Sequence, residues 1–308
     1  MLVLMSGAVG APILLDNPAT TTIGPGFLGN AFNWLFLGTL LMQFYIYWQN
    51  YPADTRIIKL LVYIIVVMEL AQTAFGTHES WWYAVGNWGN LQALQTAPWT
   101  ALVRPIMCGI IAAVVKLFYA FRIWRLRRSI LTCALVVLII MLALTQGCAV
   151  IVSVALIDED LSQQNFIHLH PVFMASVWLA GSFTTDLLIS GSMIWILQTS
   201  KSRSLVTPTN SLLNRLIVNT IQTGSATVVC AGIGLALFVK YTDKNYYYAF
   251  VYVLGKIYSN SFLATLNFRV NRKPVEIPGM RIQNQMDMGF VPSNPLAQKN
   301  DLLADEYA

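Results

Sequence analysis

The sequence predicts an all-α integral membrane protein whose fold is a seven-transmembrane-helix bundle. The chain has 308 residues, of which 56% are hydrophobic and only 11% charged, whereas about 25% of the residues in a soluble protein are charged. Its mean hydropathy is +0.59. Seven mostly apolar segments fill residues 27–269, and each is close to the roughly 20 residues that a helix needs to cross a bilayer.

The first three spans are expected at residues 27–48, 57–75 and 99–121. The first ends in QFYIYWQNYP, whose Tyr and Trp side chains suit the headgroup region and whose Pro52 ends the helix. The second is aliphatic as far as Glu69 and polar after it. The third begins near Trp99 and ends in the basic sequence KLFYAFRIWRLRRS.

The other four spans are expected at residues 129–156, 171–198, 213–239 and 246–269. The fourth is almost entirely apolar, the fifth carries Asp186 near its middle, and the sixth has a polar face that includes Asn219. In the seventh span Lys256, Asn260 and Asn267 fall on one side of the helix. Because polar groups are costly in lipid, we expect these side chains to face the interior of the bundle.

The basic residues predict the orientation of the chain in the membrane. The tail and the loops after the first, third and fifth spans hold fifteen of the 19 Lys and Arg residues, whereas the N-terminus and the other loops hold two. By the positive-inside rule the N-terminus lies outside and the C-terminus is cytosolic. Residues 1–26 are then an extracellular segment, residues 27–269 the membrane domain, and residues 270–308 a disordered cytosolic tail.

Three charged side chains are expected to form a polar pocket in the outer half of the bundle. Glu69, Arg104 and Lys256 lie about 9 to 15 Å below the outer surface, at about 1.5 Å per residue. We expect Glu69 and Lys256 to form a buried ion pair with Arg104 at its rim. This cluster carries a net charge of +1 and suits an anionic or polar ligand, although an ion pair that only orients the helices is the other interpretation.

A second polar layer is expected deeper in the bundle. Asp186 lies about two turns below the three outer charges, so it matches Lys256 poorly in depth. The layer is either a proton-sensitive relay or a set of interhelical hydrogen bonds that fixes packing. Its expected members are Asp186, Asn219, Asn260 and Asn267.

Two further groups of side chains are expected at the membrane surfaces. The loop after the second span contains Trp81, Trp82 and Trp88, and we expect it to form an interfacial lid because indole rings favour the headgroup region. The basic end of the third span either binds anionic lipid headgroups or serves only as an orientation signal. The candidate headgroup ligands are Arg122, Arg125, Arg127 and Arg128.

The motifs of the common enzyme classes are missing from the sequence. It has no Ser-His-Asp order, phosphate loop or zinc-binding helix motif, so we expect neither an enzyme nor a cofactor. A retinal imine on Lys256 would need a carboxylate counter-ion nearby; the third span offers none, so Glu69 would have to serve, and we do not expect this cofactor. His168 and His170 do not face each other on a helix, so no metal site is expected. Because the basic residues sit at helix ends, nucleic acid is not an expected partner.

Several segments together resemble an uncharacterised family of seven-helix membrane proteins from mushroom-forming (basidiomycete) fungi, catalogued as a domain of unknown function. The segments are YIYWQNYPAD, KLFYAFRIWRL, the fifth span with Asp186, RLIVNTIQTG and KIYSNSFLATLNFR. The resemblance covers the chain from about Thr22 to Arg272. It implies the seven-helix fold and its topology, but no activity.

We therefore expect a receptor-like sensor with a polar pocket in its outer half. The alternative is a transporter or channel-like carrier of a small polar or anionic solute, although no internal repeat of the kind that secondary transporters use is evident. The expected location is the plasma membrane or another membrane of the secretory pathway. Besides the lipid bilayer, the expected partners are a small ligand outside and a cytosolic protein at the third loop and the tail.

Overall fold

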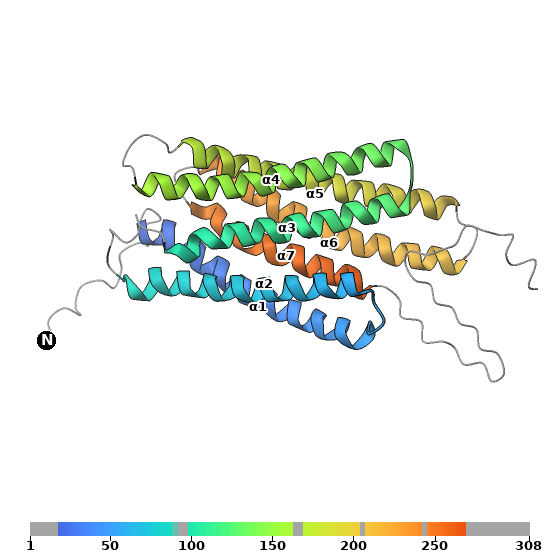
Figure 1. Cartoon of the computed structure of the whole chain (residues 1–308), viewed down its shortest axis with the longest axis horizontal. Coiled ribbons are helices and arrows are strands. Elements are labelled where there is room, and N and C mark those ends of the chain that lie inside the picture. The colour runs from blue at the N-terminus through green and yellow to red at the C-terminus, as the bar shows by residue number, and fades with distance from the viewer. Residues whose placement is uncertain are drawn as a thin grey trace, which may run out of the picture. The chain divides into compact units, whose positions relative to one another are not determined.

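The computed structural model describes residues 18–88, 90, 98–162, 169–203, 207–241 and 245–268. Within these residues the protein has seven α-helices and no strand (Figure 1). Five of the helices, α2 to α6, are long and apolar enough to cross a membrane, which indicates a membrane protein. The expected disordered tail, most of the expected N-terminal segment and His168 lie outside the described residues.

The helices extend the expected spans at most of their ends. The bounds are α1 Pro18–Asn50, α2 Arg56–Trp81, α3 Trp99–Leu126, α4 Ile130–Ser162, α5 Leu169–Arg203, α6 Thr207–Lys240 and α7 Tyr248–Asn267. A π-helical turn, η1 Trp82–Gly86, continues α2, and a 3-10 turn, η3 Asn245–Tyr247, precedes α7.

The end of α2 differs from the expectation, which stopped the helix near Phe75 and placed Trp81 and Trp82 in a loop. The helix continues because the polar side chains of the added turns have partners on neighbouring helices. Thr77 accepts a hydrogen bond from the indole of Trp34 at 3.0 Å, and the ring of His78 is bonded to the hydroxyl of Thr100 at 3.0 Å. Paired in this way, polar residues are compatible with a helix inside a bundle. The first part of the expected lid is therefore helical.

Consecutive helices run in opposite directions and pack side by side, and α7 packs against α1, so the seven helices close into a ring. α3 also contacts α5 and α7, and α7 also contacts α2. Eleven of the 20 residues of α7 are buried. α3 and α7 therefore hold the central positions from which side chains reach several other helices.

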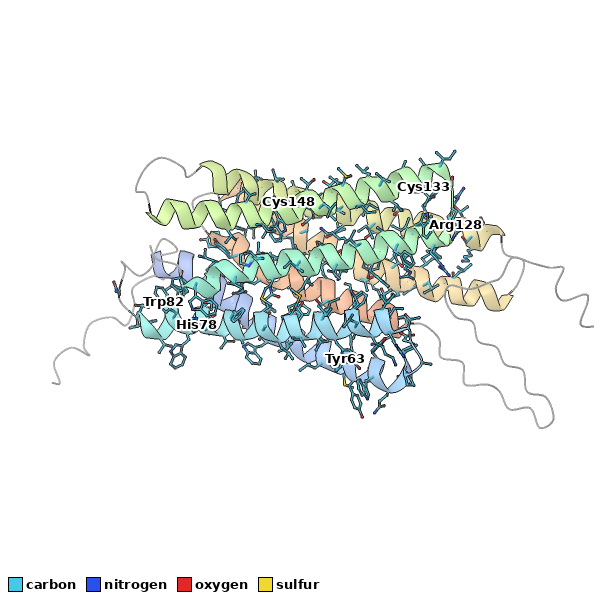
Figure 2. All side chains as sticks on the ribbon, in the orientation of Figure 1. Tyr63, His78, Trp82, Arg128, Cys133 and Cys148 are labelled. Carbon is cyan, nitrogen blue, oxygen red and sulfur yellow. The ribbon has the colours of Figure 1, made fainter. Side chains whose placement is uncertain are left out.

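The bundle has two distinct ends. The starts of α1, α3, α5 and α7 share one end with the last turns of α2, α4 and α6 (Figure 1). His78 and Trp82 lie at this end, and Arg128 and Cys133 lie at the opposite end (Figure 2). Along the helices between them, many large apolar side chains point outward, among them Leu35, Val137 and Val229. Such an apolar exterior suits lipid and would be unusual in water.

Candidate functional site

The expected ion pair between Glu69 and Lys256 is present. The ammonium nitrogen of Lys256 lies 2.6 Å from Glu69 Oε2 and donates hydrogen bonds to the Glu69 carbonyl oxygen at 2.8 Å and to Thr73 Oγ1 at 2.7 Å. The hydroxyl of Ser259 donates to the other carboxylate oxygen. Both charged side chains are 0% exposed. Three oxygen atoms thus lie within 2.8 Å of the ammonium nitrogen, and the pair is sealed inside the bundle.

Arg104 differs from the expectation, because it is not at the rim of that pair. Its Nη1 atom lies 2.7 Å from Oε2 of Glu79, an acid that the sequence pattern placed in a loop. The hydroxyl of Tyr252 donates to the other oxygen of Glu79 at 2.6 Å, and the guanidinium carbon of Arg104 lies 3.3 Å from the centre of the Tyr252 ring. The three residues Glu69, Arg104 and Lys256 alone carry the expected net charge of +1. With Glu79 included, the net charge of the group is zero.

A cavity of about 260 Å³ adjoins the Arg104–Glu79 pair at the end of the bundle where α1 starts. We call it the tyrosine pocket, because its lining includes Tyr83, Tyr248 and Tyr252. Gln72, Glu79 and Arg104 also line it, whereas Glu69 and Lys256 do not. Its volume is slightly below the range of about 300 to 1,000 Å³ that is common for drug-sized ligands.

Two residues that line the tyrosine pocket each have a buried side-chain atom without a hydrogen-bond partner among the described residues. These atoms are the donor Nε of Arg104 and the acceptor Oε1 of Gln72. Arg104 is 2% exposed and Gln72 4%. A buried polar group without a partner costs about 1 to 3 kcal/mol, so a bound molecule that pairs with both atoms would recover this free energy.

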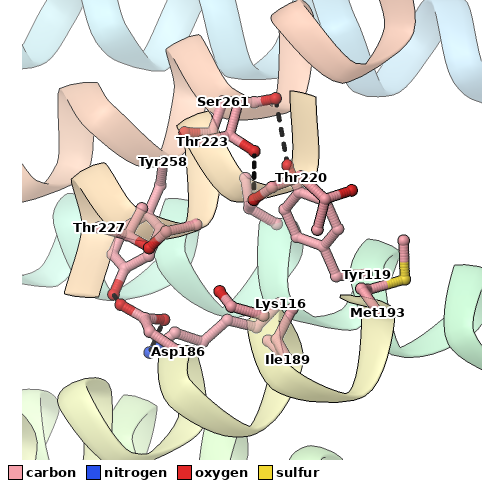
Figure 3. Close-up of a pocket in the computed structure, with 13 residues that line it drawn as sticks. Lys116, Tyr119, Asp186, Ile189, Met193, Thr220, Thr223, Thr227, Tyr258 and Ser261 are labelled. Carbon is pink, nitrogen blue, oxygen red and sulfur yellow. Dashed lines mark hydrogen bonds and ion pairs between the residues drawn. The ribbon is translucent and has the colours of Figure 1, made fainter. Parts of the chain in front are cut away.

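A third ion pair lies deeper, between Lys116 and Asp186, and sequence reasoning missed it. Lys116 Nζ lies 3.7 Å from Asp186 Oδ1 and donates to Gln146 Oε1 at 2.6 Å and to Ser182 Oγ at 3.3 Å. The hydroxyl of Tyr258 donates to Asp186 Oδ2 at 2.7 Å (Figure 3). Asp186 is therefore paired with Lys116, which was not among the expected members of its layer.

The basic count of the third span includes Lys116, the first residue of KLFYAFRIWRLRRS, as a residue at the membrane surface. Lys116 nevertheless lies within the expected span, residues 99–121. The signal in the sequence was the expected span itself, which places Lys116 five residues before its end; α3 runs on to Leu126, so Lys116 lies ten residues, or about 15 Å, before the end of the helix. The corrected basic count on the expected cytosolic side is fourteen rather than fifteen. The difference in basic residues between the two sides of the membrane, which predicts the orientation, is almost unchanged.

The four residues of the expected inner layer do not meet in one layer. Asn219 donates to Thr265 Oγ1 at 3.3 Å and so joins α6 to α7. Asn260 and Asn267 join α7 to α1, through hydrogen bonds to the carbonyl oxygens of Phe36 at 3.1 Å and Gln43 at 2.8 Å. Asp186 lies apart from these asparagines, against Lys116. The three amides make interhelical hydrogen bonds of the kind that stabilise membrane bundles.

Two of the four candidate headgroup arginines pack on tryptophan rings. The guanidinium of Arg127 lies 4.7 Å from the centre of the Trp195 ring, and that of Arg128 lies 4.8 Å from the centre of the Trp124 ring. Arg127 follows the last residue of α3, and Arg122 and Arg125 lie inside that helix. All four are at the end of the bundle opposite the tyrosine pocket.

The second half of the chain resembles a known family. Residues 182–271 match the model of a family of unknown function, DUF6534. The match begins within α5 and covers α6 and α7, so it includes Asp186, Lys256 and Tyr258. No curated protein and no solved structure matches the chain at a significant level. The chain thus contains a DUF6534 domain, for which no function is known.

Proposed function

We propose that the protein is a receptor-like membrane sensor that binds a small, uncharged, polar molecule in the tyrosine pocket. The observation that carries this proposal is the pair of unpartnered polar atoms there, Arg104 Nε and Gln72 Oε1. A ligand with a hydrogen-bond acceptor and a donor on one edge would pair with both. The aromatic walls would cover its apolar part.

The charges around the pocket favour an uncharged ligand over the anionic one that the sequence suggested. Arg104 is already neutralised by Glu79 at 2.7 Å. An anion would have to compete with this carboxylate, which is itself held by Tyr252. A cation would face the guanidinium of Arg104. An uncharged ligand with one hydrogen-bond donor and one acceptor neither competes with Glu79 nor is repelled by Arg104.

The proposed topology has seven membrane spans, an extracellular N-terminus and a cytosolic C-terminus. α1 has 33 residues and α7 has 20, so both reach the length of about 20 residues that a crossing needs. In this orientation the tyrosine pocket faces outward, and Arg127 and Arg128 lie on the cytosolic side with the tail, where a partner protein would bind. The plasma membrane or another secretory membrane suits such a sensor. We also propose membership of the fungal seven-helix family that the sequence resembles.

A carrier is the second candidate, because polar cavities lie at two depths along α3 and α7. The tyrosine pocket extends along α3 to Cys108, and a deep cavity of about 30 Å³ begins at Val115. Ile111 and Ala112 between them are buried at 0% and 3% exposure, as is Leu254 of α7 at 1%. This apolar packing and the small size of the deep cavity favour a sensor that binds its ligand and does not pass it on. They give no reason to propose catalysis.

The proposal is tested with benzamide, which carries an amide carbonyl and an amide NH₂ on the edge of one ring. Its charged analogues benzoate and benzylammonium serve as comparisons. Binding to the full chain in lipid nanodiscs is measured by calorimetry. We expect benzamide to bind more tightly than either ion, and Gln72→Leu to weaken its binding about tenfold, the equivalent of about 1.4 kcal/mol for one lost hydrogen bond.

Gln43→Leu is the matched control, because Gln43 lies on α1 and its backbone oxygen, which the substitution keeps, is the group that bonds Asn267. It should leave benzamide binding unchanged. Equal binding of all three compounds, or an unaffected Gln72→Leu variant, would show that the pocket does not select its ligand in this way. Faster uptake of radiolabelled benzamide into vesicles that contain the protein than into protein-free vesicles would support the carrier instead.

A further inference from the structure

The deep cavity is a second polar site, independent of the tyrosine pocket. It has a volume of about 30 Å³ and lies among α3, α5, α6 and α7 (Figure 3). Lys116, Asp186 and Tyr258 form one side of it, and Thr220, Thr223 and Thr227 of α6 form another. Charged and polar side chains from four helices therefore surround a space far too small for the proposed ligand.

Several of the donors around the deep cavity are already in use. Lys116 donates to Gln146 and Ser182, and Tyr258 donates to Asp186. Tyr119 is bonded to the Ser261 carbonyl oxygen at 3.1 Å and to Thr265. The three threonines donate to carbonyl oxygens of their own helix, those of Leu216, Asn219 and Gly224, at 2.8 to 2.9 Å.

Acceptor capacity remains on the same groups. A hydroxyl oxygen that donates its proton still has lone pairs, so the threonine oxygens can accept. Asp186 Oδ1 is 3.7 Å from Lys116 Nζ, which is longer than a hydrogen bond, so its lone pairs are also available. The deep cavity thus offers several acceptors to a small species that donates hydrogen bonds.

Water meets this requirement without adding charge. Lys116 and Asp186 already neutralise each other, so a metal cation or a hydronium ion would leave a net positive charge inside the bundle, which is costly in a membrane. A buried water needs about 10 to 15 Å³ of such volume and two to four polar partners. We propose that the deep cavity is a site for one or two water molecules, which donate hydrogen bonds to Asp186 and to the threonines of α6.

Water in the deep cavity would change which hydrogen bonds join α6 to the neighbouring helices. Before the three threonines of α6, Asn219 donates a hydrogen bond directly to Thr265. After them, the thiol of Cys230 lies 3.6 Å from the Phe250 carbonyl oxygen. Between these contacts, water would supply the hydrogen bonds from α6 to the ion pair. Water can exchange partners as it moves, so α6 would be able to shift here without leaving a buried polar group unpaired.

The test is X-ray radiolytic labelling of the full chain in lipid nanodiscs, which produces hydroxyl radicals from water at the place where that water lies. Met193 lines the deep cavity and is 0% exposed, so radicals from bulk water do not reach it. We expect Met193 to be oxidised. Phe262 is equally buried but does not line the cavity, and it should stay unlabelled. An unlabelled Met193 would overturn the proposal.

Variants then separate a bound water from general permeability. Thr223→Val with Thr227→Val keeps the side-chain shape and removes two acceptor oxygens, so Met193 labelling should be lost. Thr184→Val with Thr199→Val makes the same chemical change at two exposed threonines that are bonded to their own helices, and labelling should persist. Labelling that survives in the first variant, or that disappears when sodium replaces choline in the buffer, would contradict a water site.

Discussion

Lys256 and Arg104 are both buried cations that pair with an acid of α2, yet their surroundings differ. Lys256 has three oxygen atoms within 2.8 Å of its ammonium nitrogen and is fully buried between α2 and α7. Arg104 has a carboxylate and an aromatic ring, but its Nε lacks a partner and it lines a cavity. Burial and charge are nearly the same at the two sites. What separates the structural ion pair from the candidate binding site is that Arg104 and Glu79 line a cavity, whereas Lys256 and Glu69 do not.

The largest expected effect comes from breaking the sealed pair. Lys256→Met and Glu69→Leu should each destabilise the protein by about 3 to 5 kcal/mol, because each leaves an uncompensated buried charge, whereas the double variant should cost far less than the sum. Thermal unfolding in detergent measures this. If the effects of the two substitutions simply add, the pair is not a coupled unit and the contrast with Arg104 fails.

A smaller effect is expected at the open pair. Glu79→Gln keeps the shape of the side chain and should cost about 1 to 3 kcal/mol, because Arg104 keeps a weaker, uncharged partner. It also leaves the tyrosine pocket with a net positive charge. Benzoate should then bind more tightly than benzamide, in reverse of the unmodified protein. An unchanged order in calorimetry would mean that Glu79 does not set the charge preference of the pocket.

The smallest effect is expected at cations outside both buried pairs. Replacing Arg127 and Arg128 with Gln should reduce the retention of anionic phospholipid by about 1 kcal/mol per arginine. Native mass spectrometry of the protein from membranes containing phosphatidylglycerol or only phosphatidylcholine measures this. Lys59→Gln, on the α1–α2 side of the same end, is a control that removes a cation bonded to the Pro52 carbonyl oxygen. If it causes an equal loss, the two arginines are not a specific lipid site.

Sequence reasoning reached the sealed pair because depth along a helix can be counted. Glu69 and Lys256 match in depth, and their side chains lean toward each other on oppositely running helices. The helices themselves follow from hydropathy, which reports the cost of exposing polar groups to lipid. Both arguments use one helix at a time and need no knowledge of how the helices are arranged around the bundle.

The parts that were missed depend on the neighbours of each helix. Glu79 follows several polar residues and so resembles a loop residue until its partner Arg104 on α3 is known. Asn260 and Asn267 share a stripe with Lys256, but they face α1, because α7 packs against both α1 and α2. Periodicity shows which residues share a face, and only the packing order shows which helix that face meets.

The central place of α7 has a consequence for the biogenesis of the protein. α7 is the last helix among the described residues, it is not among the five helices there that are apolar enough to cross a membrane on composition alone, and it supplies the cation for Glu69, 187 residues earlier. During synthesis α2 must therefore be held with its acid uncompensated until α7 emerges from the ribosome. In the proposed seven-span topology, the insertion of α7 in turn depends on helices that are already in the bilayer, since they provide the partners for its polar side chains. In that topology the bundle is complete only when α7 has joined it.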